Sequence, residues 1–180
     1  LLQDAGVNGA NVLRRAKLPG DLFARENVRL DSETYHRLWN AIEEEAGPAG
    51  GPVPLRFAQK MTTDWFNPEL FVALCSDDLN DALNRLARYK SGPMTLRLDH
   101  TARGTTAELE FLDRAQTPPH VLMVFKLAFL VQLARIATRS PVHPVCVGWP
   151  APALSARDAG AYANWFGVAV EDLPAPIVVF

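Results

Sequence analysis

The chain has 180 residues, of which 48% are hydrophobic and 21% charged, and its formal net charge is −2. This composition is typical of a folded globular protein and excludes an intrinsically disordered chain. The near-neutral charge argues against a free-standing nucleic-acid-binding domain, which normally carries a basic excess. The length predicts a single domain over residues 1–180.

The N-terminal part of the chain is predicted to be helical. Residues 1–30 contain short helical pieces. Asp31 is a plausible N-cap for a longer helix that ends at Gly47, with apolar residues at helical spacing between them. After a loop rich in glycine and proline, residues 55–61 are expected to form another short helix.

Two more helices are expected in the middle of the chain. Asn67, followed by proline, predicts an N-cap with proline at the first helical position. The next stretch, SDDLNDALNRLARYKSG, predicts an amphipathic helix capped by Ser76 or Asp77, with its apolar stripe buried. Asp81 and Arg85 stand in the order that favours an i, i+4 ion pair on the opposite side. We therefore interpret this helix as scaffold and not as a DNA-reading element.

The spacing of hydrophobic residues then changes from the helical period of 3.6 residues to the strand period of 2 residues. MTLRLDHT and TTAELEFLD each alternate apolar and polar residues, and Gly104 can take the turn between them, so a β-hairpin is predicted. A long helix follows, entered at Thr117 and ending near Arg139. It is apolar nearly all round and should be central to the domain. Its longest apolar run, 121–133, is interrupted and too short to span a bilayer, so no membrane contact is expected.

The C-terminal segment predicts two more strands with a helix between them. VHPVCVGW and PIVVF have strand character, and Ser155 with Asp158 forms a capping box that opens the helix ended by Gly167. The resulting fold class is α+β. N-terminal helices are followed by a ββαβαβ unit, whose small, mostly antiparallel sheet packs on the long central helix.

No catalytic motif is present. The sequence contains no nucleophile elbow, zinc-protease motif, phosphate-binding loop or dinucleotide fingerprint. Cys75 and Cys146 lie in apolar surroundings and are expected to be buried free thiols rather than metal ligands. We therefore expect no enzymatic activity, no cofactor and no metal.

Lys126 is the most unusual residue, because it interrupts the apolar central helix. Burying an unpaired ammonium costs several kcal/mol, so Lys126 must pair, extend to the surface, or face a cavity. His120 begins the same helix, and Arg114 lies a few residues earlier. These three side chains are candidates for binding an anionic group.

Two further groups of residues are candidates for a binding site. Trp65, Phe66 and Phe71 form an aromatic cluster, which is either core or the lining of an apolar pocket. Arg88 and Tyr89, at the exit of the amphipathic helix, are candidates for a polar pocket edge or an interface.

The segments in their chain order resemble the N-terminal sensor domain of AraC-type transcriptional regulators, often called arabinose-binding-domain-like. The resemblance covers nearly the whole chain. It rests on AGVNGANVLRRAKLPGDLF followed by RLDSETYHRLWNAIEEEAG, on LFVALCSDDLNDALNRLARYKS, and on GWPAPALSARDAGAYANWFGVAV.

The resemblance implies a cytoplasmic bacterial regulator that contacts DNA only through a C-terminal helix-turn-helix domain, which this chain lacks. The chain starts without methionine and stops in an apolar run, so we expect a piece of a longer protein. We expect it to bind a small-molecule effector of amphipathic or acidic character. The candidate ligand-binding residues are Trp65, Phe66, Phe71, Arg88, Tyr89, Arg114, His120 and Lys126.

Two alternatives stay open at this point. The chain is a dimerisation module that forms a homodimer without a ligand, or it is a small enzyme of unknown reaction. The second alternative lacks a nucleophile and base that can be named.

Overall fold

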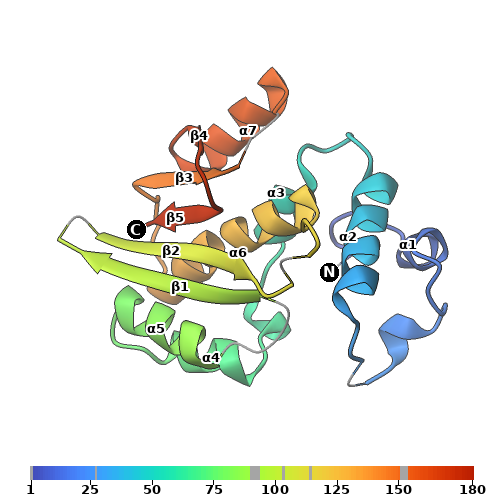
Figure 1. The fold of residues 1–180 in the computed structure, drawn as a ribbon, viewed down its shortest axis with the longest axis horizontal. Coiled ribbons are helices and arrows are strands. Elements are labelled where there is room, and N and C mark those ends of the chain that lie inside the picture. Colours follow the sequence, from blue (N-terminus) through green and yellow to red (C-terminus); the bar gives the residue numbers. More distant parts are fainter. Residues whose placement is uncertain (1, 27, 90–93, 103, 114, 151–153) are drawn as a thin grey trace.

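The computed structural model describes residues 2–26, 28–89, 94–102, 104–113, 115–150 and 154–180, with helices first and a mixed sheet after them (Figure 1). The helices before the sheet are α1 (Gly9–Arg15), α2 (Ser32–Ala46), α3 (Val53–Gln59), α4 (Pro68–Leu74) and α5 (Leu79–Tyr89). Strands β1 (Met94–Thr101) and β2 (Gly104–Phe111) precede the long helix α6 (His120–Thr138). Strand β3 (Cys146–Trp149), helix α7 (Ala156–Phe166) and strands β4 (Val170–Asp172) and β5 (Ile177–Val179) complete the described chain.

Local side-chain caps fix most of the helix starts. Asp31, Asn67 and Ser155 each accept a hydrogen bond from the backbone N–H three residues later, at 2.7, 3.0 and 3.1 Å. Each cap satisfies one of the free N–H groups of a first helical turn. The predicted caps of α2, α4 and α7 are therefore confirmed.

The start of α5 differs from the prediction. The capping residue is Asp78, which accepts from the backbone N–H of Asp81 at 2.8 Å, and neither Ser76 nor Asp77 has this role. The predicted ion pair between Asp81 and Arg85 is confirmed at 2.9 Å. The helix buries its apolar stripe and leaves its charged side chains outside.

The sheet has the strand order β1-β2-β5-β3-β4. β1 and β2 form the predicted antiparallel hairpin, in which Arg97 lies opposite Glu108. β5 pairs antiparallel with both β2 and β3, whereas β4 pairs parallel with β3. The mostly antiparallel sheet is confirmed, but β4 was not predicted from the sequence and makes the sheet five-stranded.

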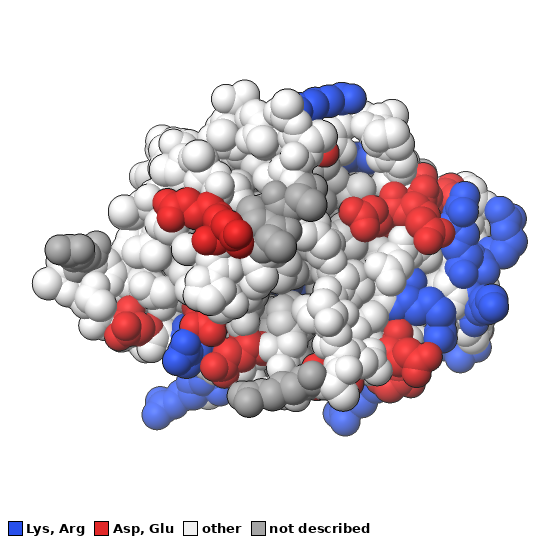
Figure 2. Space-filling model, turned by 45° about the horizontal axis from the view of Figure 1, so that its top comes forward, with Lys and Arg blue, Asp and Glu red and all other residues white. Residues whose placement is uncertain are grey.

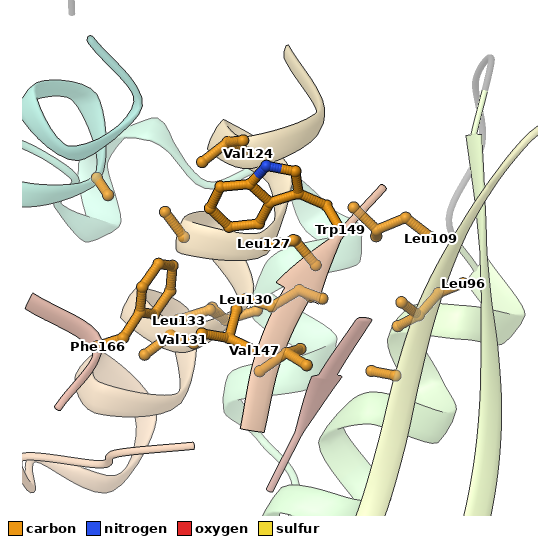
Figure 3. Close-up of a cluster of buried hydrophobic side chains, with 14 of the residues drawn as sticks. Leu96, Leu109, Val124, Leu127, Leu130, Val131, Leu133, Val147, Trp149 and Phe166 are labelled. Atoms are coloured by element: carbon orange, nitrogen blue, oxygen red, sulfur yellow. The ribbon is translucent and has the colours of Figure 1, made fainter. Parts of the chain in front are cut away.

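Helix α6 lies at the centre of the domain, between two hydrophobic clusters. Val124, Leu127 and Val131 face the sheet and α7 (Figure 3). Val121 and Phe125 face α1, α2 and α3, where Phe125 contacts the ring of Trp39 with centroids 5.0 Å apart. Among the described helices, α6 is the one long and apolar enough to suit a membrane span, yet its apolar side chains are mostly buried inside this domain. An apolar surface all round is what a helix between two packed layers needs.

The two cysteines do not follow the prediction. Cys75 is exposed and Cys146 is partly exposed, although both are free thiols. Cys75 follows the last residue of α4, which is a short helix at the surface, so its apolar sequence neighbours do not enclose it.

Candidate functional site

Lys126 places a charge inside the apolar layer between α6 and the sheet. Its Nζ atom lies 5.6 Å from the ring centroid of Phe125 and 6.0 Å from that of Phe129. Among the described residues, Lys126 forms no ion pair with a carboxylate. Burial of the ammonium lowers the pKa of Lys126 from 10.5 to about 8. The two aromatic faces offset only part of the cost of desolvation.

The side chain of Lys126 lines a cavity of about 210 Å³. This volume equals about seven water molecules at about 30 Å³ each. The cavity walls come from α4, α5, α6 and the hairpin. The lining residues are Asn67, Glu69, Leu70, Leu86, Met94, Leu96, Leu109, Lys126, Phe129 and Leu130.

The walls of this cavity, hereafter the Lys126 cavity, separate into apolar and polar parts. Met94, Leu96 and Leu109 present the core face of β1 and β2, and they are almost fully buried. The polar side chains are Lys126 on α6 and Asn67 and Glu69 at the start of α4. An apolar enclosure with a few polar groups is the usual composition of a small-molecule site.

The predicted aromatic cluster is not the lining of this cavity. Phe66 is buried in the main core, and Phe71 is 47% exposed on α4, with the two ring centroids 6.0 Å apart. The side chain of Trp65 and all of Arg114 lie outside the described part of the chain.

His120 is the first residue of α6 and does not line the Lys126 cavity. Its ring contacts Trp149 edge-on, with centroids 5.7 Å apart, and partial burial there lowers the pKa of His120. Trp149 is fully buried, and its Nε1 has no hydrogen-bond acceptor among the described residues. His120 and Lys126 therefore do not share one site.

Arg88 and Tyr89 line a different and larger hollow, on the outer face of α4 and α5. This hollow of about 580 Å³ is open to solvent and is also bordered by Val72, Asp81, Asn84 and Arg85. The volume of this hollow is large because it opens widely to solvent and is not surrounded by protein on most sides. The Lys126 cavity is less open and has a more apolar lining, so it is the better candidate for a small ligand, and the outer hollow is a surface feature.

Of the predicted site residues that the structure describes, only Lys126 lines the cavity of about 210 Å³. The sequence does not indicate that Asn67 and Glu69 belong to it, because Asn67 followed by proline predicts a helix cap. The two roles are compatible. The Asn67 Oδ1 atom accepts from the Leu70 N–H, and its amide nitrogen is left for another contact.

The surface carries no extended basic face in the view of Figure 2. Acidic and basic side chains alternate over the region of α1 and α2, at the right of that view, and the middle is largely uncharged. On this face, interspersed charges of both signs do not provide the basic stripe that phosphate backbones require.

Comparisons with known proteins agree with this architecture. A family model described as the arabinose-binding domain of AraC transcription regulator, N-term, matches residues 6–171. No curated protein matches the sequence. The crystal structure of the transcriptional regulator CdpR from Pseudomonas aeruginosa is similar in fold, with a TM-score of 0.51 and 15% sequence identity. The match covers 86% of this chain and 56% of the CdpR chain, so this chain spans little more than half the length of that regulator.

Proposed function

We propose that this chain senses an acidic small molecule bound in the Lys126 cavity. The chain belongs to the family of N-terminal arabinose-binding domains of AraC transcription regulators. The family consists of ligand-binding domains of transcription regulators and not of enzymes. The effector, the cytoplasmic location and the transmission of the signal to a DNA-binding domain elsewhere in the parent protein are parts of this proposal.

One observation carries the proposal. Lys126 is a charged side chain on a buried helix, and it lines a cavity without forming an ion pair among the described residues. A buried charge normally has a counter-charge, because its desolvation costs several kcal/mol. A ligand carboxylate in the cavity supplies that counter-charge and restores the ordinary preference of Lys126 for the protonated form.

The dimensions of the cavity restrict the effector. A volume of about 210 Å³ is below the roughly 300–1,000 Å³ of common ligand pockets. Only a compact acid fits, with one short chain or one ring against Met94, Leu96 and Phe129. A bound ligand would connect α4 and α5 to α6 and the hairpin, and it would therefore favour one arrangement of these elements over another.

Isothermal titration calorimetry with amino acids, short fatty acids and single-ring aromatic acids tests the proposal. We expect at least one acid to bind to the wild-type protein, and Lys126→Met to weaken that binding at least about tenfold, which is a loss of about 1.4 kcal/mol. Lys60→Met is the matched control, because Lys60 is exposed and does not line the cavity. Equal binding to wild type and Lys126→Met would refute the role of Lys126.

A further inference from the structure

A second and much smaller void lies beside the Lys126 cavity, between α4, α5 and α6. Its volume is about 10 Å³, which is at the lower limit of what one water molecule needs. All of its lining side chains are apolar and several are alanines, so a dry space is left unfilled between the helices. The lining residues are Ala73, Leu79, Ala82, Leu83, Leu86, Leu130, Leu133, Ala134 and Ala137.

Leu86 on α5 and Leu130 on α6 line both the Lys126 cavity and this void. The two side chains therefore form the wall between the two spaces, and both are almost fully buried. Because this wall is made of side chains, their size decides how far the Lys126 cavity extends towards the void.

The void lies beyond Leu130 when α6 is followed from Lys126. Lys126, Leu130 and Ala134 are four residues apart, so they follow one side of α6 in steps of about 6 Å. Leu86 and Ala82 have the same spacing on α5. An alkyl chain that starts at the Lys126 ammonium and runs along α6 reaches the two leucines first and the alanines after them.

The apolar lining of the Lys126 cavity suits such a chain. Phe129 is the one aromatic residue among those that line it. The other apolar residues are leucines and a methionine, whose flexible side chains adapt to a narrow ligand. They are Leu70, Leu86, Met94, Leu96, Leu109 and Leu130.

We propose that the effector is a linear carboxylic acid and that Leu86 and Leu130 determine the length of its alkyl chain. The inference rests on the proposed function, because the carboxylate of the acid pairs with Lys126. The end of the chain contacts the two leucines in the wild type, so a longer acid has to displace them. Removing either leucine side chain joins the void to the cavity and lets a longer acid bind.

Truncation of Leu86 tests the inference by calorimetric titration with straight-chain acids from butanoate to decanoate at pH 7. Leu86→Ala removes three carbon atoms from the wall, so the acid that binds most tightly should become longer by about two to three methylene groups. Each methylene that leaves water strengthens binding about fourfold, which is about 0.8 kcal/mol. An acid two carbons longer than the wild-type optimum should therefore bind to Leu86→Ala at least about tenfold more tightly than to wild type.

Leu83→Ala is the matched control. Leu83 is as buried as Leu86 but lines only the void, so the same truncation leaves the wall in place and should not change the preferred chain length. Leu86→Val removes one carbon atom and disturbs the core less, and it should lengthen the preferred acid by about one methylene group. Thermal melts verify that each variant is folded, and Leu86→Val provides the test if Leu86→Ala does not fold.

The results that overturn this inference differ from those that overturn the proposed function. Acids that bind through Lys126 with the same preferred length in wild type and in the Leu86 variants would overturn the chain-length inference alone. The same holds if Leu83→Ala lengthens the preferred acid as much as Leu86→Ala does. Acids that fail to bind, or that bind equally to wild type and Lys126→Met, would overturn the proposed function and this inference with it.

Discussion

Replacing Lys126 with methionine should stabilise the protein, and by an amount that depends on pH. The pKa of Lys126 is lowered from 10.5 to about 8 by burial. A tenfold change in a protonation equilibrium corresponds to about 1.4 kcal/mol, so the charged side chain costs the folded state roughly 3 kcal/mol. Methionine preserves most of the side-chain volume but loses the contacts of the ammonium with Phe125 and Phe129. At pH 7 the expected net gain is about 1 to 3 kcal/mol.

The pH dependence follows from the sign of the shift. Because the folded-state pKa lies below the unfolded one, both states are protonated below about pH 8 and the full penalty is present there. Between about pH 8 and 10.5 the unfolded chain binds the proton more tightly than the folded chain. The stability of the wild type therefore rises relative to Lys126→Met as the pH increases through this range, and the difference between the two proteins shrinks.

Urea unfolding at pH 7, 8, 9 and 10 measures this difference, since ionisations common to both proteins cancel. Thermal melts at pH 7 should show a Tm higher by roughly 2–12 °C in Lys126→Met, given about 2–4 °C per kcal/mol for a domain of this size. Lys60→Met should stay within about 0.5 kcal/mol of wild type at pH 7. A difference that does not change with pH, or a Lys126→Met variant less stable than wild type at pH 7, would refute the reasoning.

Three other predictions concern the site and the core. The affinity for an acidic effector should fall about fivefold between pH 8 and pH 9 in calorimetric titrations, because above about pH 8 the amine of Lys126 must be protonated before it can pair with the ligand. Trp149→Phe should cost less than about 2 kcal/mol in urea unfolding, because it removes a buried N–H without an acceptor, whereas Trp149→Ala should cost about 3–5 kcal/mol. Gly148→Ala should destabilise the protein by about 1–3 kcal/mol in the same assay, since its Cβ would lie 2.4 Å from the carbonyl oxygen of Glu171 and separate β3 from β4.

The elements that depend on neighbouring residues could be predicted from the sequence. The caps of α2, α4 and α7 and the hairpin β1–β2 each follow from a pattern within a few residues. Strand β4 could not be predicted in this way. It has only three residues, two of them acidic, and it is extended because it pairs with β3. Tertiary pairing and not local preference makes this segment a strand.

The candidate site was predictable only in part, for the same reason. Lys126 is conspicuous because a charge interrupts an apolar helix. The remaining walls of the cavity come from four other elements, whose positions are set by packing. Arg88, predicted as part of a polar pocket edge or an interface, borders the outer hollow and does not line the Lys126 cavity. At 3.6 residues per turn it lies about 200° around α5 from Leu86, which faces the cavity.

His120 is close to Lys126 in the sequence of α6 but does not line the same cavity. It lies six positions before Lys126, about 9 Å along the axis and about 240° around it. The two side chains therefore leave the helix in different directions, and His120 contacts Trp149 instead of the cavity.

Methionine-methyl NMR shows directly whether an acid binds beside Lys126. The chain has three methionines, and of these only Met94 lines the Lys126 cavity, whereas Met61 and Met123 lie elsewhere in the domain. With methyl-¹³C-methionine labelling, hexanoate and benzoate are titrated against their neutral amides, hexanamide and benzamide. We expect that an acid shifts the Met94 resonance, that its amide binds at least about tenfold more weakly, and that Lys126→Met abolishes this preference. Binding of an acid beside Lys126 is contradicted if neither acid shifts the Met94 resonance. It is also contradicted if acid and amide shift this resonance equally in wild type and in Lys126→Met.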